Sequence, residues 1–307
     1  MEKIYDMVII GGGPGGYTAA LYGARAGLAT LILEKMAAGG QMALTSQIDN
    51  YPGFPEGVDG FELGMRMKQG AERFGAESRS SEVLSVDWKA QPKRIVTDSG
   101  AVLGKTVILS TGASPRLLGI PREQELTGRG VSYCAHCDGM FYRGKTVVVV
   151  GGGNSAVADA LILSRIAAKV ILVHRRDALR ATKIYHEQLQ RAENVKFRWN
   201  SAVVQLHDEG KLNAVTVRNL LTGDEDRMDV DGLFVSIGRQ PASDLAKGAL
   251  DMDESGYVIA GESTETNIPG VFAVGDVRTK QLRQIVTAVA DGASASHYAE
   301  EYLAKLG

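Results

Sequence analysis

Gly11-Gly12-Gly13-Pro14-Gly15-Gly16 is the stretch that decides the fold of this 307-residue chain. An apolar run at 7–10 precedes the loop, an alanine-rich segment at 15–26 follows it, and a second apolar run lies at 31–33. A strand, a tight glycine turn, a helix and a second strand make the βαβ unit of a dinucleotide-binding fold. Glycine is needed because the backbone turns sharply and approaches a pyrophosphate at the helix N-terminus. We therefore expect a nucleotide-binding domain at the start of the chain.

Glu34 ends the second strand of this unit, about 20 residues beyond the loop, where a carboxylate accepts hydrogen bonds from ribose hydroxyls. A carboxylate there also repels a 2′-phosphate. The first loop is therefore expected to bind an unphosphorylated adenosine, as in FAD or NAD. The alternative is a glycine turn inside a sheet with no ligand, and the strand, helix and acid around the loop argue against it.

The same plan returns at Gly151-Gly152-Gly153-Asn154-Ser155-Ala156, which matches the G-x-G-x-x-A form of the loop. An apolar strand is expected at 147–150, a helix at 155–166 and a second strand at 170–173. That second strand ends in His174-Arg175-Arg176, at the position that Glu34 holds in the first half, with the charge reversed.

Arg180 lies four residues beyond Arg176 and adds a third arginine to this segment. Arginine suits a 2′-phosphate because its guanidinium makes bidentate, charge-assisted hydrogen bonds. The alternative is a solvated basic start of a helix. One nucleotide site is thus expected to select against the phosphate and the other for it.

Each βαβ unit is followed by short alternating strands with turns, at 83–109 and at 203–237. Both sets have the pattern of an antiparallel meander, and each ends in an apolar strand that closes on a glycine. Matching halves predict a duplicated α/β fold. We expect two Rossmann-like dinucleotide-binding domains (the FAD/NAD(P)-binding fold), each a parallel sheet with helices plus an antiparallel β-meander.

The tail from about Asp244 has no glycine loop of its own. It carries an apolar strand that ends in Gly275-Asp276, and a helix expected at 284–306. Such a strand best completes an existing sheet, so we expect the tail to return to the first domain. Asp276 would then bond hydroxyls of a bound cofactor, and the alternative is an ordinary Gly-Asp turn. The expected domains are 1–112 with 244–307, and an inserted 113–243 whose two crossings make a hinge.

Composition and charge argue against a nucleic-acid-binding protein and against a membrane protein. A formal net charge of -2 gives no global attraction to nucleic acid or to an anionic membrane. The first residues run straight into a strand without the pattern of a signal peptide, and no apolar run approaches the ~18 residues that span a bilayer. We therefore expect a cytoplasmic protein with no nucleic-acid and no membrane partner.

Cys134-Ala135-His136-Cys137-Asp138 holds the chain's two cysteines. A zinc site needs about four ligands, and this chain has no second pair, so we expect no metal. Two buried, inert cysteines are the structural alternative. The third interpretation is a redox-active pair, favoured by the short spacing and by Asp138, whose carboxyl could give or take a proton as a disulfide opens.

Taken together, these motifs resemble the low-molecular-weight, bacterial-type thioredoxin reductases across nearly the whole chain. The resemblance implies FAD in the discontinuous domain and NADPH in the inserted one, and a homodimer. The implied FAD residues are Gly11, Gly13, Pro14, Gly15, Glu34, Gly40, Gln41, Asn50, Thr111, Gly112, Gly275, Asp276, Arg283, Gln284 and Ile285. The implied NADPH residues are Gly151, Gly153, Asn154, Ser155, Ala156, His174, Arg175, Arg176 and Arg180.

The resemblance also implies a reaction. Reducing power passes from NADPH through FAD to the Cys134–Cys137 disulfide and then to the disulfide of thioredoxin. Cys137 resembles the thiol that faces the flavin, Cys134 the one that attacks the partner, and Asp138 the proton donor. The inserted domain rotates so that the nicotinamide and the dithiol reach the flavin in turn.

Two departures from the family pattern stand out. His136 replaces a smaller residue between the cysteines, and Ala158-Asp159 stands where two glutamates are frequent.

Three other functions stay open at this point. The same chemistry could serve another disulfide, in a glutaredoxin-like protein, a peroxidase component or a small molecule. A ferredoxin–NADP oxidoreductase shares the fold, but the cysteine pair argues against it. A redox sensor would bind the nucleotides without turnover.

Overall fold

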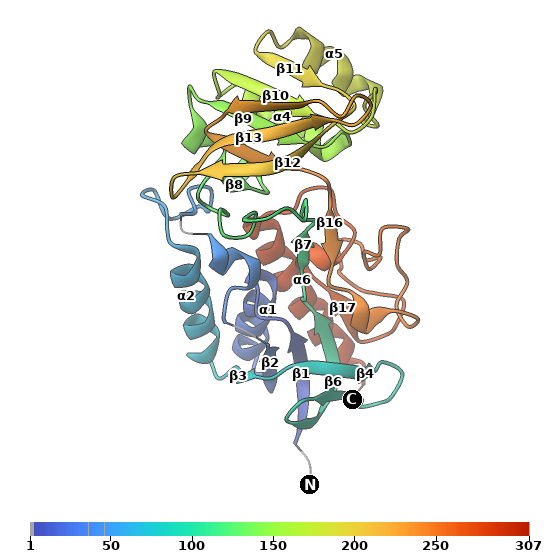
Figure 1. Cartoon of the computed structure of the whole chain (residues 1–307). Coiled ribbons are helices and arrows are strands. Elements are labelled where there is room, and N and C mark those ends of the chain that lie inside the picture. Colours follow the sequence, from blue (N-terminus) through green and yellow to red (C-terminus); the bar gives the residue numbers. More distant parts are fainter. Residues whose placement is uncertain (1–2, 36, 46, 307) are drawn as a thin grey trace. The chain divides into compact units, whose positions relative to one another are not determined.

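The computed structural model describes residues 3–35, 37–45 and 47–306 (Figure 1). The chain divides into two compact units. The first consists of Met1–Ser114 with Gln240–Gly307, and the second of Pro115–Arg239. Each has its own sheets and its own buried clusters.

The first unit is built on a seven-stranded sheet with the order β3-β2-β1-β6-β5-β4, and β17 pairs with β6 off this path. Strands β1, β2, β3, β6 and β17 run parallel, whereas β4, β5 and β6 form an antiparallel meander. The strands are β1 (Ile4–Ile10), β2 (Thr30–Glu34), β3 (Glu77–Ser80), β4 (Val83–Asp87), β5 (Lys93–Thr97), β6 (Gly100–Leu109) and β17 (Val271–Ala273).

Alternate residues of β1 enter two different cores. Val8 and Ile10 join one buried cluster, and Met7 and Ile9 join the other. A strand buried on both faces is typical of the centre of a parallel sheet covered on both sides. This explains why the segment reads as a continuous apolar run rather than as an alternating one.

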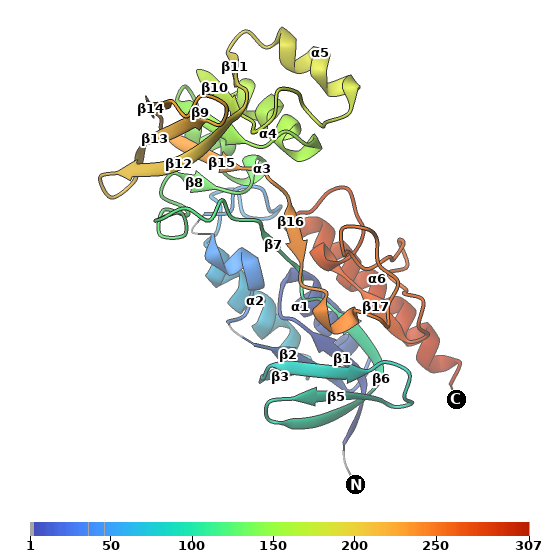
Figure 2. The same cartoon turned by 45° about the vertical axis from the view of Figure 1, so that its right-hand side comes forward.

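Helices α1 (Pro14–Arg25) and α6 (Ile285–Ala304) pack against each other in the first unit (Figure 2). Small residues permit the close approach: Ala19 is fully buried, and a Cβ added at Gly292 would meet the backbone of α1. The unit also contains α2 (Gly60–Glu72), which is capped by Asp59. Its short 3-10 turns are η1 (Gly40–Leu44), η3 (Asp244–Ala246) and η4 (Gly275–Val277).

The second unit holds a five-stranded parallel sheet with the order β11-β10-β9-β15-β8. Val147 and Val149 of β9 face the cluster that contains its helices, and Val148 and Val150 face the meander. The elements are β8 (Val131–Ser132), α3 (Ala135–Asp138), η2 (Gly139–Tyr142), β9 (Thr146–Val150), α4 (Asn154–Ser164), β10 (Lys169–Val173), α5 (Lys183–Arg191), β11 (Val195–Arg198) and β15 (Gly232–Val235).

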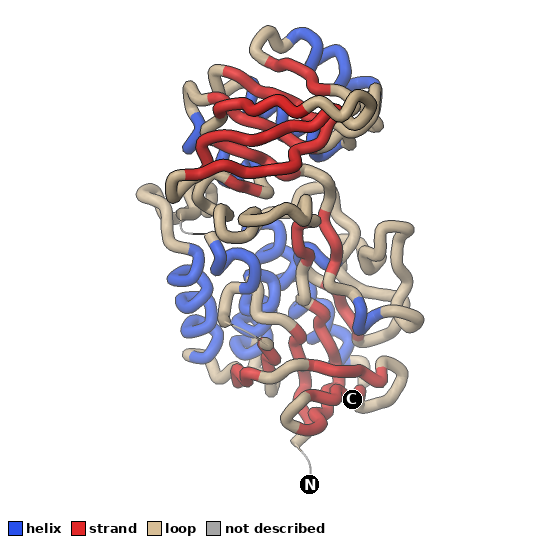
Figure 3. Tube along the Cα trace, in the orientation of Figure 1, coloured by secondary structure: helices blue, strands red, loops and turns tan. Residues whose placement is uncertain are grey.

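The meander of the second unit is a separate three-stranded antiparallel sheet (Figure 3). Its strands are β12 (Ser201–Asp208), β13 (Leu212–Asn219) and β14 (Glu225–Asp229). The expectation that the meander runs on to residue 237 is wrong, because β15 leaves it and pairs in parallel with β9. All four residues of β15 are buried, which suits the interior of a parallel sheet and not a one-sided meander.

The two segments that connect the units pair with each other. They are β7 (Ala113–Pro115) and β16 (Arg239–Pro241), which form a two-stranded ladder.

Candidate active site and cofactor loops

The first glycine loop follows β1, and its glycines play three separate parts. Gly11 has φ 106°, in the left-handed region that favours glycine, and its N–H donates to Leu33 O at 2.8 Å. A Cβ on Gly16 would collide with the carbonyl of Gly11, so Gly16 is needed for close packing of helix on strand. A Cβ on Gly13 would meet nothing within 4 Å. That open side is where a pyrophosphate can approach, so the loop fits a dinucleotide.

Pro14 and Gly15 form the start of α1, with Pro14 in its first turn. Proline suits that position because the missing N–H would have had no helical partner. Gly15 is buried, and a Cβ there would come within 3.2 Å of Val274. The two residues therefore hold the helix N-terminus behind the loop, in the place expected from the sequence.

Glu34 lies at the end of β2, and its carboxylate accepts a hydrogen bond from the Gly12 N–H. The acid is therefore directed at the loop, as a ribose-binding carboxylate requires. Burial, and then the charge of Glu34, raise the pKa of the neighbouring Tyr17 to about 12.

The segment Gly39–Gln41 lies against the same loop. The Gly39 N–H donates to Gly12 O at 2.8 Å, and a Cβ on Gly40 would lie 3.4 Å from the Gly13 Cα. Gln41 follows in η1 and is exposed. Both segments thus meet at Gly12 and Gly13, although about 25 residues separate them in the chain.

Thr111, Gly112, Gly275 and Asp276 come from two further strand ends. Thr111 and Gly112 follow β6, and Gly275 and Asp276 follow β17. Because β1, β2, β6 and β17 are parallel, their carboxyl ends share one edge of the sheet, where open α/β sheets bind ligands. The Thr111 hydroxyl donates to Ala242 O at 2.6 Å, and the Gly275 N–H donates to Asp291 Oδ2 at 2.8 Å.

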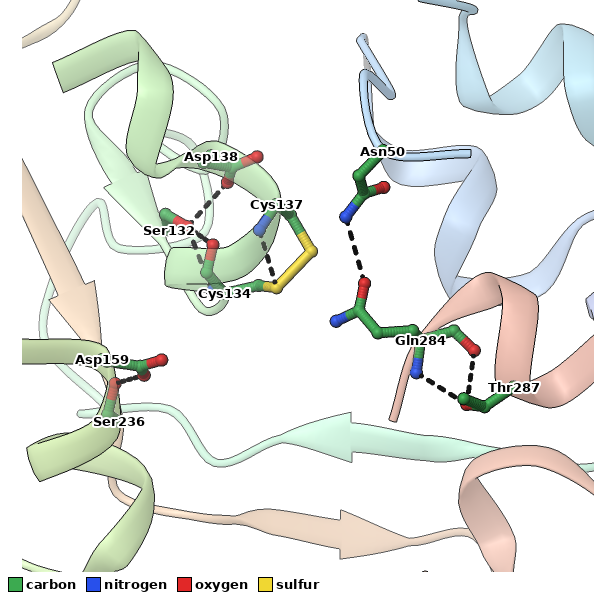
Figure 4. Close-up of a disulfide and its surroundings, with 9 residues drawn as sticks. All are labelled: Asn50, Ser132, Cys134, Cys137, Asp138, Asp159, Ser236, Gln284 and Thr287. Atoms are coloured by element: carbon green, nitrogen blue, oxygen red, sulfur yellow. Dashed lines mark hydrogen bonds between the residues drawn. A yellow bond between two sulfur atoms is a disulfide. The ribbon is translucent and has the colours of Figure 1, made fainter. Parts of the chain in front are cut away.

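Asn50 and Gln284 meet across 234 positions of sequence, with the Asn50 amide donating to Gln284 Oε1 at 3.1 Å (Figure 4). Gln284 also caps α6 through a reciprocal capping box with Thr287. Ile285 opens α6 and packs on the small cluster around Met42. The Arg283 guanidinium lies 4.0 Å from the ring centre of Tyr257.

Asp291 of α6 was not predicted from the sequence. Its carboxylate accepts hydrogen bonds from the Arg278 side chain at 2.9 Å and from Lys280 Nζ at 2.7 Å, besides the Gly275 N–H. The side chains of all three charged residues are at most 10% exposed. This buried carboxylate therefore fixes the turn that carries Gly275 and Asp276 to the helix that begins at Ile285. A lone aspartate within a helix carries no motif that could have indicated it.

The second glycine loop repeats the geometry of the first. Gly151 has φ 148°, and its N–H donates to Val173 O at 3.1 Å. Gly153 has open space where a Cβ would be, and Ala156 is fully buried beneath the loop. Asn154 and Ser155 are exposed in the first turn of α4, and Asn154 Oδ1 accepts from the Thr182 N–H at 2.9 Å. This loop, too, fits a dinucleotide.

His174 occupies the place that Glu34 holds in the first unit. Its ring lies on Gly152, as the Glu34 carboxylate lies on Gly12, and it is 3% exposed. Burial, then the charge of Arg180, lower the pKa of His174. Its Nε2 has no hydrogen-bond partner among the described residues. The imidazole is therefore neutral at physiological pH, and the positive charge of this segment resides on the arginines that follow.

Arg175, Arg176 and Arg180 are all exposed. The Arg180 N–H donates to Gly152 O at 2.7 Å, which brings the end of the arginine segment back to the glycine loop. The Asn200 N–H donates to Arg176 O at 3.1 Å. Three exposed arginines that follow the strand end next to this loop are candidates to bind an anionic group of a nucleotide.

Cys134 and Cys137 form a disulfide with their Cα atoms 5.3 Å apart, at the start of α3 (Figure 4). The Cys137 N–H donates to Cys134 Sγ at 3.2 Å. A donor aimed at this sulfur favours the thiolate when the disulfide is reduced. Both residues are partly exposed, so the pair is not the inert buried pair considered from the sequence.

Asp138 follows directly and ends α3. Burial raises the pKa of its carboxyl, and a hydrogen bond from Ser132 opposes that rise. The Ser132 hydroxyl donates to Asp138 Oδ2 at 2.6 Å. A partly buried carboxyl with a raised pKa next to a dithiol is a candidate proton donor.

Asp159 is another partly buried carboxylate of this unit. It lies on α4 and accepts a hydrogen bond from the Ser236 hydroxyl at 2.5 Å (Figure 4). Burial raises its pKa, and the charge of His136 is among the effects that oppose the rise. The residue that departs from the family pattern at position 159 therefore has a defined partner at the end of β15.

The described residues hold no group of three His, Cys, Asp or Glu side chains that could bind a metal ion. Within residues 3–35, 37–45 and 47–306, none of the helices combines the length and the apolar character needed to cross a bilayer.

A family model described as pyridine nucleotide-disulphide oxidoreductase matches residues 5–292. A thioredoxin reductase from Peptoclostridium acidaminophilum is 45% identical over 99% of this chain and 98% of its own. A bifunctional thioredoxin reductase/thioredoxin from Mycobacterium leprae is 45% identical over 99% of this chain and 67% of its own. The crystal structure of thioredoxin reductase from Streptococcus pyogenes superposes with a TM-score of 0.93 at 42% identity, covering 99% of this chain and 100% of that one.

The chain therefore belongs to the pyridine nucleotide-disulphide oxidoreductases and, within that family, to the group of the thioredoxin reductases. The resemblance inferred from the sequence motifs and the expected α/β class are both confirmed. Membership implies a flavin and a pyridine nucleotide as cofactors.

Proposed function

We propose that this protein is an NADPH-dependent FAD enzyme that reduces the disulfide of thioredoxin through Cys134 and Cys137. The observation that carries the proposal is the disulfide beside a partly buried carboxyl with a raised pKa, in a chain with two loops that fit dinucleotides. One relative joins a thioredoxin reductase and a thioredoxin in its name, which supports thioredoxin as the partner.

The two loops are assigned to different nucleotides by the charge at equivalent positions. Glu34 in the first unit supports FAD there, and the residues after the first loop at the other strand ends would hold the remainder of that cofactor. Arg175, Arg176 and Arg180 in the second unit support NADPH, whose 2′-phosphate they would bind. When bound, FAD supplies a two-electron carrier between the nicotinamide and the disulfide.

The thiol steps follow from the geometry of the pair. After reduction, the Cys134 thiolate, stabilised by the Cys137 N–H, attacks one sulfur of the partner disulfide. The partner S–S bond breaks, a mixed disulfide forms, and Asp138 gives its proton to the departing thiolate. Cys137 then gives its proton to the Asp138 carboxylate and attacks Cys134 Sγ. The bond between Cys134 and the partner breaks, the Cys134–Cys137 disulfide forms again, and the second partner sulfur takes that proton as it leaves, so the partner is released as a dithiol.

The remaining parts of the proposal come from the family resemblance. The domains assigned to FAD and NADPH are 1–112 with 244–307, and 113–243. The inserted domain would rotate about the segments that contain β7 and β16. The enzyme would work as a homodimer in the cytoplasm, where a Cys-x-x-Cys pair carries redox chemistry.

A turnover assay tests the proposal directly. Purified protein with NADPH, thioredoxin and a disulfide reporter dye should turn over, and alkylation after reduction by NADPH should stop it. Alkylation of the oxidised enzyme is the control, because the disulfide shields both sulfurs. Cys137→Ser should lose thioredoxin reduction. A Cys137→Ser enzyme that reduced thioredoxin at the wild-type rate would refute the proposal. Reduction of ferredoxin that alkylation did not affect would instead favour a ferredoxin–NADP oxidoreductase.

A further inference from the structure

Ser132 lies at the end of β8 and is 3% exposed, beside the Cys-x-x-Cys segment. Three polar groups lie within reach of its hydroxyl. Asp138 Oδ2 is at 2.6 Å, the Cys134 N–H at 3.1 Å and the Cys134 carbonyl at 3.5 Å. Figure 4 shows the serine between the carboxyl and the backbone of Cys134.

A hydroxyl has a single proton to donate, so these contacts are not equivalent. The contact with Asp138 is the shortest, and hydrogen bonds to a charged acceptor are stronger than those to a carbonyl. The proton therefore goes to Asp138, and an oxygen lone pair accepts the Cys134 N–H. One serine thus links the carboxyl that follows Cys137 to the backbone of Cys134.

We propose that Ser132 is a positioning residue for proton transfer, which holds the Asp138 carboxyl and the Cys134 backbone in one hydrogen-bonded unit beside the dithiol. The inference rests on the proposed function, in which Asp138 gives a proton to a departing thiolate. The side chain of Ser132 contacts neither cofactor nor substrate in this assignment and acts through Asp138.

The charge balance at Asp138 shows what Ser132 contributes. Burial raises the pKa of Asp138, and the hydrogen bond from Ser132 is the effect that opposes burial. Tyr142 on η2 is a titratable neighbour. Burial first, then the charges of Asp138 and Asp231, raise its pKa to about 12, so it is neutral and adds no charge near pH 7. Across the unit, α4 presents Asp159, which is bonded to Ser236, and His136 lies on α3 itself.

Removing the Ser132 hydroxyl has two expected effects. The carboxyl loses the donor that favours its charged form, so its pKa rises further. It also loses the contact that fixes its orientation. A rate that depends on protonated Asp138 declines as pH rises through the pKa of that carboxyl. In the pH profile of thioredoxin reduction, this limb of declining rate should therefore move to higher pH in Ser132→Ala. The rate at the optimum should fall about tenfold, less than the 10²–10⁴-fold expected when an acid is removed outright.

The experiment compares Ser132→Ala, Ser132→Thr and Asp138→Asn in the holoenzyme, with the pH profile of NADPH-dependent thioredoxin reduction as the readout. Ser132→Thr keeps a hydroxyl and should restore both the rate and the limb. Ser132→Ala should add little to Asp138→Asn in the double variant, because the serine acts through that carboxyl. The matched control is Ser243→Ala, which removes an equally buried serine that donates to Gly256 O at 2.7 Å in the first unit. It should leave the limb in place.

A second readout separates this inference from the proposed function. Infrared difference spectra should show a carboxyl band that Asp138→Asn removes, and this band should titrate at higher pH in Ser132→Ala, with no partner present. A band that titrates alike in wild type and Ser132→Ala would overturn the inference, even if thioredoxin is the substrate. A shifted band in an enzyme that ignores thioredoxin would instead sustain the inference and refute the partner.

Discussion

Asp291 shows how one buried side chain can organise a cofactor edge. Two cations, Arg278 and Lys280, converge on its carboxylate, which also receives the N–H of Gly275. Burial opposes the charged form, but the hydrogen bonds from Arg278 and Lys280 outweigh burial and lower the pKa of Asp291. The ionised carboxylate is therefore part of the folded state throughout the neutral range.

Asp291→Asn should destabilise the fold strongly, because it leaves two cations buried without their counter-charge. Breaking such a pair costs about 3–5 kcal/mol, measured here by urea unfolding at neutral pH. The control is Asp226→Asn, which breaks the exposed pair with Arg198 and should cost about 0–1 kcal/mol. Equal losses in the two variants would contradict the role given to Asp291.

The pH dependence of that difference has a definite sign. A carboxyl whose pKa is lower in the folded state stabilises fully above its unfolded pKa, here near the ordinary 3.8, and the stabilisation is lost as pH falls through the folded pKa. The gap between wild type and Asp291→Asn should therefore be constant from pH 7 to about 5 and should shrink below about 4. Unfolding curves collected across that range give the measurement. A stability difference between wild type and Asp291→Asn that widened on acidification would contradict a lowered pKa for Asp291.

The arginines of the second unit carry the prediction on cofactor choice. If Arg175 and Arg176 bind the 2′-phosphate, replacing both by alanine should raise the KM for NADPH and leave the KM for NADH nearly unchanged. Each lost charge-assisted hydrogen bond is worth about 1.5–3 kcal/mol, or roughly 10- to 100-fold in affinity. Arg191→Ala, on α5, is the matched control, since its side chain is 82% exposed. Equal kcat/KM values for NADPH and NADH in the wild type would contradict the assignment of these arginines to the 2′-phosphate.

Glycines at different positions of the same loop are required for different physical reasons. Gly16 lies where any side chain would strike the Gly11 carbonyl, whereas Gly13 has open space and an ordinary φ of -76°. Packing therefore depends on Gly16, and access for a ligand depends on Gly13. The second unit reaches the same result with Ala156 as its packing residue.

The variants Gly13→Ala and Gly16→Ala should consequently fail in different ways. Gly13→Ala should fold with nearly unchanged stability but bind FAD more weakly, because its methyl group occupies the side from which a pyrophosphate approaches. Gly16→Ala should lower the stability of the folded apoprotein, because its methyl group would collide with the Gly11 carbonyl. Thermal unfolding of the apoprotein and titration with FAD separate the two effects. If both variants lost stability alike and kept their FAD affinity, Gly13 would not face the ligand.

Local signals explain which elements could be predicted. The strands and glycine loops at residues 7–34 and 147–173 were predictable, because apolar runs and turn residues act over a few positions. The pairing of β15 with β9 was not, because β15 directly follows the antiparallel strands β12 to β14 in the chain, whereas its partner β9 lies far earlier. Contacts such as Asn50 with Gln284 depend on folding of the whole unit. Ser132 and Asp291 belong to no motif, so only their hydrogen bonds indicate a role.

At the scale of the whole molecule, two units repeat one architecture and differ in the charge of the residues beside their glycine loops. The first presents a carboxylate, Glu34, beside its loop, and the second presents a neutral histidine followed by arginines. The second unit alone contains the disulfide. This division of labour indicates a single route for electrons, from a phosphorylated nucleotide through a flavin to sulfur.

Anaerobic titration of the oxidised holoenzyme with NADPH tests that route most directly. Flavin and disulfide each accept two electrons, so the wild type should take up two equivalents of NADPH per chain and gain two free thiols. The Cys134→Ser/Cys137→Ser variant, with flavin alone, should take up one. A wild-type enzyme whose flavin is reduced by one equivalent while Cys134 and Cys137 stay joined under excess NADPH would contradict the account.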